Sequence, residues 1–179
     1  MAARAVEPGV SHTMSFLQTA VVGILLITSG QSIAGITPGV ADHVLIEKAA
    51  RKLTLFSNGV AIRTYRVALG SHPVGPKERQ GDGRTPEGTY TIDSRLSNSS
   101  YHRALHISYP NREDTARAAK LGTNPGGDIM IHGIRNGLGW LGPLSLVIDW
   151  TKGCIAVTNP EIEEIWKLIP VGTAVDIKP

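Results

Sequence analysis

Cys154 and His132 are the two residues of this chain best suited to nucleophilic chemistry. Cys154 is the only cysteine among 179 residues, and the apolar run Ile129-Met130-Ile131 leads directly into His132, as the end of a buried strand would. A thiol becomes a good nucleophile when a base takes its proton, and a lone Cys with a His elsewhere in the chain is a candidate pair. The structural alternative is that the free Cys is only a small buried hydrophobe.

The residues next to Cys154 favour the catalytic interpretation. Gly153 would leave room for a substrate backbone beside the thiol. The run from Thr151 to Cys154 could direct its backbone N–H groups at one point, as an oxyanion site requires. If Thr151 capped a helix here, the helix N-terminus would also lower the pKa of the thiol. Lys152 is either a cation for the thiolate or a substrate carboxylate, or a solvated side chain.

These residues together resemble a known family. His132-Gly133, a spacer over residues 134–150 and Thr151-Lys152-Gly153-Cys154-Ile155 are similar to the signature of the YkuD-type L,D-transpeptidases. The segment GDGRTPEGTY over residues 81–90 is similar to the one that precedes the family's active site, and the resemblance covers roughly residues 44–178. Two positions depart from the commoner family form: Lys152 replaces a His, and Ala156 replaces an Arg that is thought to help bind substrate.

The resemblance implies an L,D-transpeptidase catalytic domain over residues 43–178. Its expected fold is mainly β, a sandwich-like mixed sheet with two or three short helices. Cys154 would attack a peptide carbonyl, His132 would be the general base, and the Gly133 carbonyl would orient the imidazole. Backbone N–H groups near Gly153 and Cys154 would hold the oxyanion. The substrates would be peptidoglycan stem peptides, with an amine on another stem or on a wall-attached protein as acceptor.

The same resemblance implies no metal or other cofactor, and we expect a monomer. Two other functions stay open. One is an L,D-carboxypeptidase or endopeptidase that uses water as acceptor. It stays open because Ala156 replaces the Arg that the commoner family form has at this position. The other is a non-catalytic wall-binding module. The net charge of +3 without a run of Lys and Arg does not suggest nucleic-acid binding, and six histidines without carboxylates at ligand spacing do not make a metal site.

Further candidates for substrate binding lie in two loops. Arg84 belongs to a Gly- and Pro-rich loop over residues 70–88, where it could bind a carboxylate or be solvated. Trp140 lies in a Gly-rich segment and could form a wall for a peptide or anchor the loop. Asp149 is an acidic alternative for orienting His132, although a turn cap at Thr151 fits it better. His106 is expected to pack or face solvent.

Periodicity places the elements that would position these residues. It predicts an antiparallel meander over 43–69 with a hairpin turn at Asn58-Gly59, and strands over 89–93, 105–109, 128–131 and 173–177. Helices are predicted over 111–121 with Asn111 as cap, and over 159–168 with Asn159 as cap. The polar stretch 96–103 reads as irregular, and Trp150 and Trp166 as packing residues.

Residues 1–34 differ from the rest of the chain. An apolar run over residues 20–27 and the small-residue pattern Ser32-Ile33-Ala34 are typical of a cleaved signal peptide. Arg4 is the only basic residue before the run, and Met14 could be the true start. An uncleaved anchor and a disordered leader are the alternatives, but the run is shorter than the ~20 residues that a membrane span needs. We therefore expect export to the periplasm or cell envelope, with membrane contact only if the leader stays uncleaved.

Overall fold

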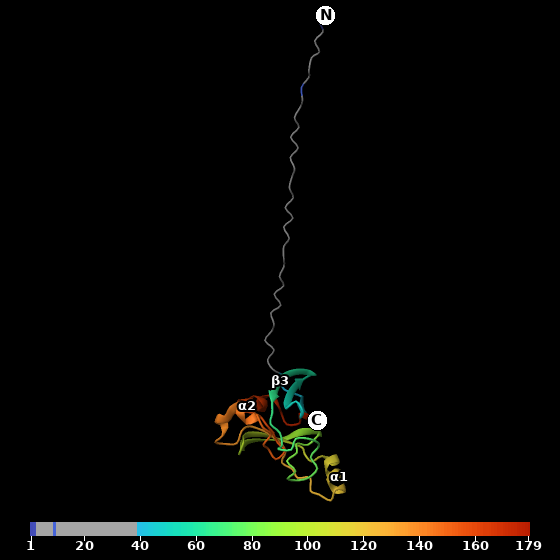
Figure 1. The fold of residues 1–179 in the computed structure, drawn as a ribbon, viewed down its shortest axis with the longest axis vertical. Coiled ribbons are helices and arrows are strands. Elements are labelled where there is room, and N and C mark those ends of the chain that lie inside the picture. Colours follow the sequence, from blue (N-terminus) through green and yellow to red (C-terminus); the bar gives the residue numbers. More distant parts are fainter. Residues whose placement is uncertain (3–8, 10–38) are drawn as a thin grey trace. The chain divides into compact units, whose positions relative to one another are not determined.

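The computed structural model describes residues 1–2, 9 and 39–179, and its regular elements lie between residues 43 and 178 (Figure 1). The predicted leader over 1–34 lies outside the described residues except for 1–2 and 9. Among the residues described, no helix is long and apolar enough to cross a membrane. The strands are β1 (His43–Glu47), β2 (Lys52–Ser57), β3 (Val60–Arg66), β4 (Gly88–Ser99), β5 (His102–Ile107), β6 (Met130–His132), β7 (Ile155–Ala156) and β8 (Ala174–Lys178). The helices are α1 (Arg112–Lys120), α2 (Asn159–Leu168) and the 3₁₀ segment η1 (Gly139–Leu146).

The eight strands form one mixed sheet in the order β3-β2-β1-β8-β4-β5-β6-β7. β1 pairs with β8 and β6 pairs with β7 in parallel, and the remaining neighbours are antiparallel. The predicted mixed, mainly β fold with short helices is therefore confirmed. The meander at its start is confirmed too: Asn58 and Gly59 have φ values of 51° and 76°, which a tight hairpin turn requires.

The prediction of irregular chain over 96–103 is wrong. β4 continues to Ser99, and β5 begins at His102, with irregular register near Leu96. The stretch is polar because most side chains in this part of β4 are exposed, so that no buried face gives it an apolar period. The β4–β5 hairpin matters for the site because it carries Tyr101.

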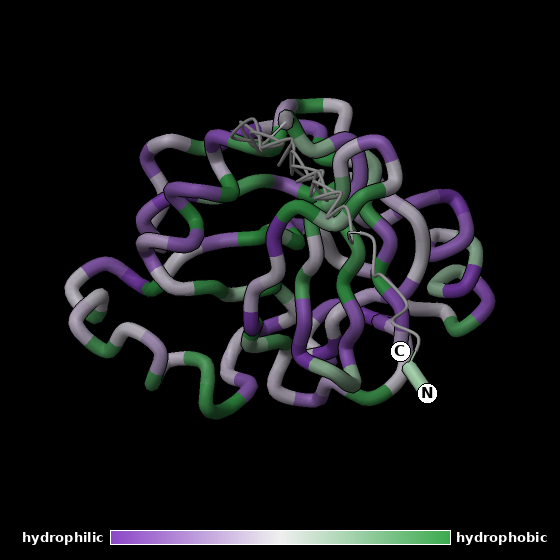
Figure 2. The backbone as a smooth tube through the Cα atoms, turned by 90° about the horizontal axis from the view of Figure 1, so that it is seen from above, coloured by the Kyte–Doolittle hydropathy of each residue, from purple (hydrophilic) through white to green (hydrophobic). Residues whose placement is uncertain are grey.

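A continuous hydrophobic core underlies the sheet, and α2 covers β5. Figure 2 shows the hydrophobic stretches gathered in the middle of the molecule and much of the hydrophilic chain in outer loops. Ile162 and Ile165 of α2 are fully buried, one helical turn apart. The predicted cap of this helix was wrong by one residue. Thr158 is the N-cap, and its N–H and hydroxyl donate to the Glu161 carboxylate at 2.8 and 2.6 Å, while the Asn159 side chain accepts from the Ile134 N–H at 2.8 Å.

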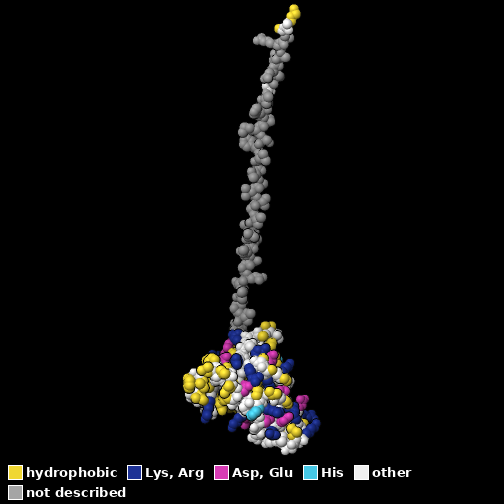
Figure 3. Space-filling model, viewed as in Figure 1, with side chains coloured by type: hydrophobic (Ala, Val, Ile, Leu, Met, Phe, Trp, Pro, Cys, Tyr) yellow, Lys and Arg dark blue, Asp and Glu magenta, His cyan; other side chains and the backbone are white. Residues whose placement is uncertain are grey.

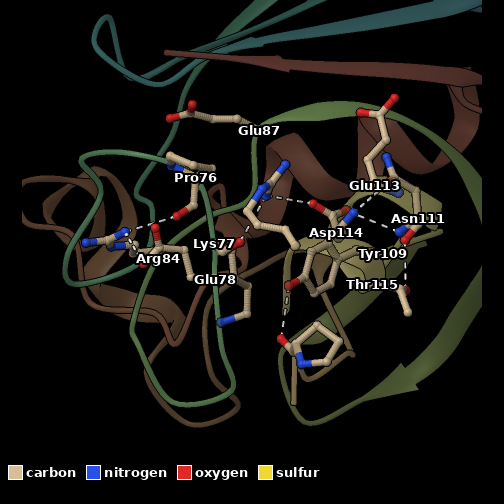
Figure 4. A network of polar contacts seen from close by, with 12 residues as sticks. Pro76, Lys77, Glu78, Arg84, Glu87, Tyr109, Asn111, Glu113, Asp114 and Thr115 are labelled. Atoms are coloured by element: carbon tan, nitrogen blue, oxygen red, sulfur yellow. Dashed lines mark hydrogen bonds and ion pairs between the residues drawn. The ribbon is translucent and has the colours of Figure 1, made fainter. Parts of the chain in front are cut away.

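The loop over residues 70–87 lacks long strands, as predicted, but buried cations hold it in place. Lys48 Nζ, at the end of β1, donates to the Gly75 and Thr85 carbonyls at 2.6 and 2.9 Å and to Glu87 at 2.7 Å. Lys77 Nζ pairs with Asp82 at 2.7 Å. α1 lies beside this loop and has the predicted Asn111 cap, with Asp114 completing a capping box (Figure 4).

Candidate active site

His132 and Cys154 are brought together by the parallel pairing of β6 and β7. Ile131 lies opposite Ile155, and His132 lies opposite Ala156. This register places Cys154, the residue before β7, next to Met130, and the two-residue period of strands puts Cys154 and His132 on the same face. Both side chains line one cavity of about 780 Å³. The predicted pair therefore opens into a common space.

The imidazole of His132 is buried and oriented by the backbone. Nδ1 lies 2.7 Å from the Gly133 carbonyl oxygen, so Nδ1 carries the proton and Nε2 has the lone pair. The side chain is only 3% exposed, and burial lowers its pKa below the ordinary value, an effect that the Gly133 hydrogen bond opposes. At neutral pH the ring is thus uncharged, as a general base must be.

Two aromatic rings pack on this imidazole. The Tyr101 ring lies 4.5 Å from it and the Trp150 ring 5.8 Å, centroid to centroid. Tyr101 comes from the turn between β4 and β5, and Trp150 from the segment before Thr151. Both line the cavity as well. Trp150 packs against a small buried cluster, in line with its predicted packing role, and also lines the cavity, which was not predicted.

The thiol of Cys154 hydrogen-bonds to the backbone. It donates to the Asp128 carbonyl oxygen at 3.4 Å. Burial raises the pKa of the thiol, and the approach of the Met130 N–H lowers it by less. The predicted helix N-terminus is absent, because the chain runs from Thr151 through a bend into β7. The expectation of a lowered thiol pKa is therefore wrong.

Thr151 and Gly153 close the tight turn before Cys154. Thr151 Oγ1 donates to the Cys154 carbonyl at 2.7 Å and accepts from the Gly153 N–H at 3.1 Å. The Gly153 N–H is therefore engaged within the turn, contrary to its predicted role at an oxyanion. Gly153 has a φ of 128°, and a Cβ there would lie 2.6 Å from the Arg84 carbonyl oxygen and 3.1 Å from Ile129 Cδ1. Its missing side chain makes room for the chain's own backbone, not for a substrate.

Gly133 is required by its surroundings as well. A Cβ on it would lie 2.8 Å from Asn159 Oδ1 and 3.1 Å from the Tyr101 carbonyl oxygen. Because Gly133 has no side chain, α2 and the β4–β5 turn can approach the residue that follows His132. The carbonyl that orients the imidazole is thereby fixed in place.

The remaining predicted residues are divided between the cavity and other places. Lys152 lines the cavity and is exposed, with Thr151 beside it. The Arg84 guanidinium lies at a separate, smaller cavity, where it bonds the Pro76 carbonyl and pairs with Glu78, both at 3.2 Å (Figure 4). Trp140 is 77% exposed and does not line the main cavity.

The two acid–base alternatives lie elsewhere. Asp149 forms a bidentate pair with Arg51, at 2.7 and 2.9 Å to one oxygen, and accepts from the Leu69 N–H at 2.8 Å. The predicted turn cap at Thr151 is therefore wrong, because the carboxylate joins the β1–β2 turn, through Arg51, to the segment after β3, through the Leu69 N–H. His106 pairs with Asp93 at 2.6 Å on the sheet surface and does not line the cavity.

Sequence reasoning missed Lys77, a buried cation that lines the cavity. It is 4% exposed, pairs with Asp82 at 2.7 Å and donates to the Arg79 carbonyl at 3.1 Å. Its charge acts to lower the pKa of Cys154. The only indication in the sequence was that Lys77 lies in the loop before the GDGRTPEGTY segment. A Lys in a polar loop is expected to be exposed, so its burial was not predicted. Across residues 39–179 no cluster of His, Cys, Asp and Glu could hold a metal ion.

Comparison with known proteins identifies the family to which the chain is similar. Residues 41–177 match the family model described as YkuD: L,D-transpeptidase catalytic domain. YafK of Escherichia coli strain K12, named as an L,D-transpeptidase, is 32% identical over 134 residues, which are 71% of this chain and 46% of YafK. YkuD of Bacillus subtilis strain 168, with the same designation, is 29% identical over 84% of this chain and 77% of its own length. The chain thus spans about half the length of the E. coli relative.

Solved structures agree in fold. Bd1075 of Bdellovibrio bacteriovorus is 27% identical with a TM-score of 0.55, and the match covers 77% of this chain and 48% of Bd1075. The helical cell shape determining protein Pgp2 of Campylobacter jejuni has a TM-score of 0.61 at 24% identity, over 79% of this chain and 49% of Pgp2. At this sequence identity, the similarity to Pgp2 shows a shared fold and nothing about activity.

Proposed function

The chain belongs to the YkuD-type L,D-transpeptidase catalytic domain family, and from this premise we propose that it is a cysteine-dependent acyl transferase acting on peptidoglycan stem peptides. One observation carries the proposal: the only thiol and a neutral, backbone-oriented imidazole open into the same cavity. The cavity has room for a peptide, since ligand sites commonly measure about 300–1,000 Å³. The substrate class comes from the family, whose members act on this polymer.

The proposed reaction begins with proton transfer from the Cys154 thiol to Nε2 of His132. The sulfur attacks the carbonyl carbon of the amide between an L-centre and a D-centre. The resulting tetrahedral oxyanion collapses, the C–N bond breaks, and the departing amine takes the proton from the imidazolium. A thioester on Cys154 remains. An acceptor amine, or water, then attacks the thioester, gives a proton to His132, and releases the thiol.

The thiol and imidazole are both uncharged before substrate binds, so activation is proposed to occur during attack. Burial disfavours the charged forms of both groups. A preformed thiolate–imidazolium pair would need the opposite shifts. Because the Gly153 N–H is engaged by Thr151, the proposal assigns the Cys154 N–H as an oxyanion donor.

Hydrolysis is the second candidate, and Ala156 is the observation in its favour. This residue is fully buried between β6 and the bridge to Ala68, so its position cannot present a cation to a substrate. Lys152 and Lys77, which line the cavity, would then be the cations available to bind an acceptor stem. A site without a strong hold on an acceptor stem would release the acyl group to water more readily.

Incubation of the purified protein with defined tetrapeptide muropeptides, followed by mass spectrometry, tests the function. New cross-linked products support transfer, and stems that are shortened by one residue or released support hydrolysis. Cys154→Ala is the control and should be inactive with unchanged folding. Binding without turnover by the unaltered chain would instead favour a wall-binding module.

We also propose that the chain is exported to the periplasm or cell envelope, where its substrate lies. The proposal rests on the leader pattern over residues 1–34. N-terminal sequencing of the protein from a fractionated cell envelope tests it, with cleavage after Ala34 expected. Recovery of the full chain in the cytosolic fraction would contradict it.

A further inference from the structure

Five large hydrophobic side chains near the active site are exposed. Their exposed fractions are 41% for Leu138, 77% for Trp140, 69% for Leu144, 65% for Val147 and 68% for Ile148. We call these five residues the 138–148 patch. Figure 3 shows hydrophobic side chains gathered on the side of the folded part where Figure 1 draws this orange segment. A contiguous apolar patch of this kind commonly marks an interaction surface.

The patch is presented by an anchored segment. Leu146, in the same segment, is buried in a small cluster with Ala68 and Ala156, against which Trp150 packs. The Ser145 hydroxyl donates to the Gly142 carbonyl at 2.7 Å. These contacts use the inner side chains of the segment for packing, and they leave the patch residues facing outward. The exposure of the patch therefore follows from how η1 and the residues next to it pack on the rest of the domain.

Two exposed cations without ion-pair partners in the described part of the chain flank the patch in sequence. No Asp or Glu occurs between residues 129 and 148, and Asp149, which follows the patch, is paired with Arg51 at 2.7 Å, whereas Arg135 and Lys152 on the two sides are exposed. Neither cation forms an ion pair within residues 39–179. A Trp among aliphatic side chains with cations at the margin is the chemistry that an anionic lipid surface recognises, because Trp favours the membrane–water interface and Lys and Arg bind anionic headgroups.

We propose that the 138–148 patch docks onto the surface of an anionic phospholipid bilayer. Such docking would keep the active-site cavity at the membrane surface. Trp150 lines the cavity and donates from Nε1 to the Ser145 carbonyl at 2.9 Å, and Lys152 both lines the cavity and flanks the patch. The proposal does not depend on acyl transfer, because binding is measured without turnover.

Tryptophan fluorescence of the full chain with vesicles tests the docking. The chain has three Trp residues, at 140, 150 and 166, and none in residues 1–38. Quenching by phosphatidylglycerol vesicles with brominated acyl chains therefore reports on the folded part and not on the leader. We expect strong quenching that weakens at high salt, little with brominated phosphatidylcholine, and loss of most quenching in Trp140→Phe.

A matched pair of variants separates the patch from general hydrophobicity. Leu144→Ser with Val147→Ser should lower the quenching at fixed lipid roughly tenfold, from the apolar area removed. Val60→Ser with Val171→Ser changes two similarly exposed residues outside the patch and should leave quenching unchanged. Circular dichroism confirms that both pairs fold.

Three outcomes would overturn the proposal. The first is vesicle binding without Trp140 quenching, which would assign membrane contact to the leader. The second is absence of binding to the vesicles; if the protein is then a dimer whose mass falls to that of a monomer in the Leu144→Ser, Val147→Ser variant, the patch is assigned to a second copy. The third is equal quenching in both variant pairs.

Discussion

The ring of Tyr101 lies against the imidazole of His132, with their centroids 4.5 Å apart and their planes inclined by 38°. Trp150 packs on the same imidazole with its ring inclined by 63°. The two aromatic residues come from chain segments almost 50 positions apart, yet both line the cavity that Cys154 lines. We interpret them as positioning residues that hold His132, the proposed general base, in one orientation.

Tyr101→Ala should lower kcat by about tenfold, since misplacing a general base reduces its contribution to the rate. Tyr101→Phe should retain nearly all activity, because the ring and not the hydroxyl contacts His132. The measurement is kcat and KM on a muropeptide substrate. An equal loss in both variants, or a change confined to KM, would contradict the positioning role.

The pH dependence of Cys154 alkylation tests whether the thiol and imidazole form an ion pair. Because burial raises the pKa of Cys154, alkylation by iodoacetamide should be slow at neutral pH. The rate should increase only at pH values above about 8.5, the ordinary pKa of a thiol. His132→Gln should leave this profile nearly unchanged while abolishing acyl transfer. Fast labelling at neutral pH that disappears in His132→Gln would indicate a preformed thiolate pair instead.

The acid limb of the activity profile should lie below about 6.5, the ordinary pKa of His. Burial lowers the pKa of His132, so the imidazole stays neutral and able to accept a proton to lower pH than a free His would. The measurement is kcat/KM between pH 4 and 8 in a buffer series of constant ionic strength. An acid limb above the ordinary value would mean that the charged imidazole is stabilised, contrary to its surroundings.

Gly153→Ala should cost more stability than Gly59→Ala. Both positions have positive φ, 128° and 76°, but a Cβ at Gly59 meets nothing within 4 Å whereas one at Gly153 lies 2.6 Å from a carbonyl oxygen. We expect about 1 kcal/mol for Gly59→Ala from backbone strain alone, and about 3 kcal/mol for Gly153→Ala. Urea denaturation gives both values, and equal losses would contradict the packing described around Gly153.

Asp82→Asn tests how the loop before the site is held. Burial acts to raise the pKa of Asp82, but Lys77 and three backbone N–H groups outweigh it and lower the pKa to about 2. A lowered pKa contributes stability that is present above the unfolded value of about 3.9 and is lost as pH falls toward 2. The shift corresponds to roughly 2–3 kcal/mol at neutral pH.

The Asp82→Asn variant should therefore be less stable than the unaltered protein at pH 7, and the difference should shrink between pH 4 and pH 2. Denaturation midpoints at several pH values give the comparison. Glu113→Gln, an exposed carboxylate at the start of α1, is the control. A constant difference across the pH range would show that the charge of Asp82 is not its source.

Much of the architecture could be predicted from local patterns. The Asn58-Gly59 turn and the Asn111 cap are encoded by residues that adopt those conformations on their own. The hairpin around Tyr101 could not be predicted, because the second half of β4 is mostly exposed, and no apolar alternation marks the residues on either side of the turn. The Asn159 cap failed for a tertiary reason: its amide is used by Ile134, a residue 25 positions away.

The candidate site, too, was predicted in part and missed in part. The spacing of His132 and Cys154, together with the family resemblance, pointed to a pair that the β6–β7 register brings to one cavity. Arg84 was predicted to bind substrate, but its guanidinium pairs with Glu78 and donates to the Pro76 carbonyl. Nothing in the sequence indicates that these residues are its partners. Lys77 and Trp150 were missed because composition assigns a lysine to solvent and a tryptophan to packing.

The most direct measurement for the central claim is the intact mass of the protein during turnover. Rapid quenching of a reaction with a tetrapeptide stem should show a fraction of the chain heavier by the acyl group, and peptide mapping should place that group on Cys154. His132→Gln should accumulate little of this thioester, and Cys154→Ala none. A product that forms at the normal rate in Cys154→Ala, or an acyl group on any other residue, would contradict the account.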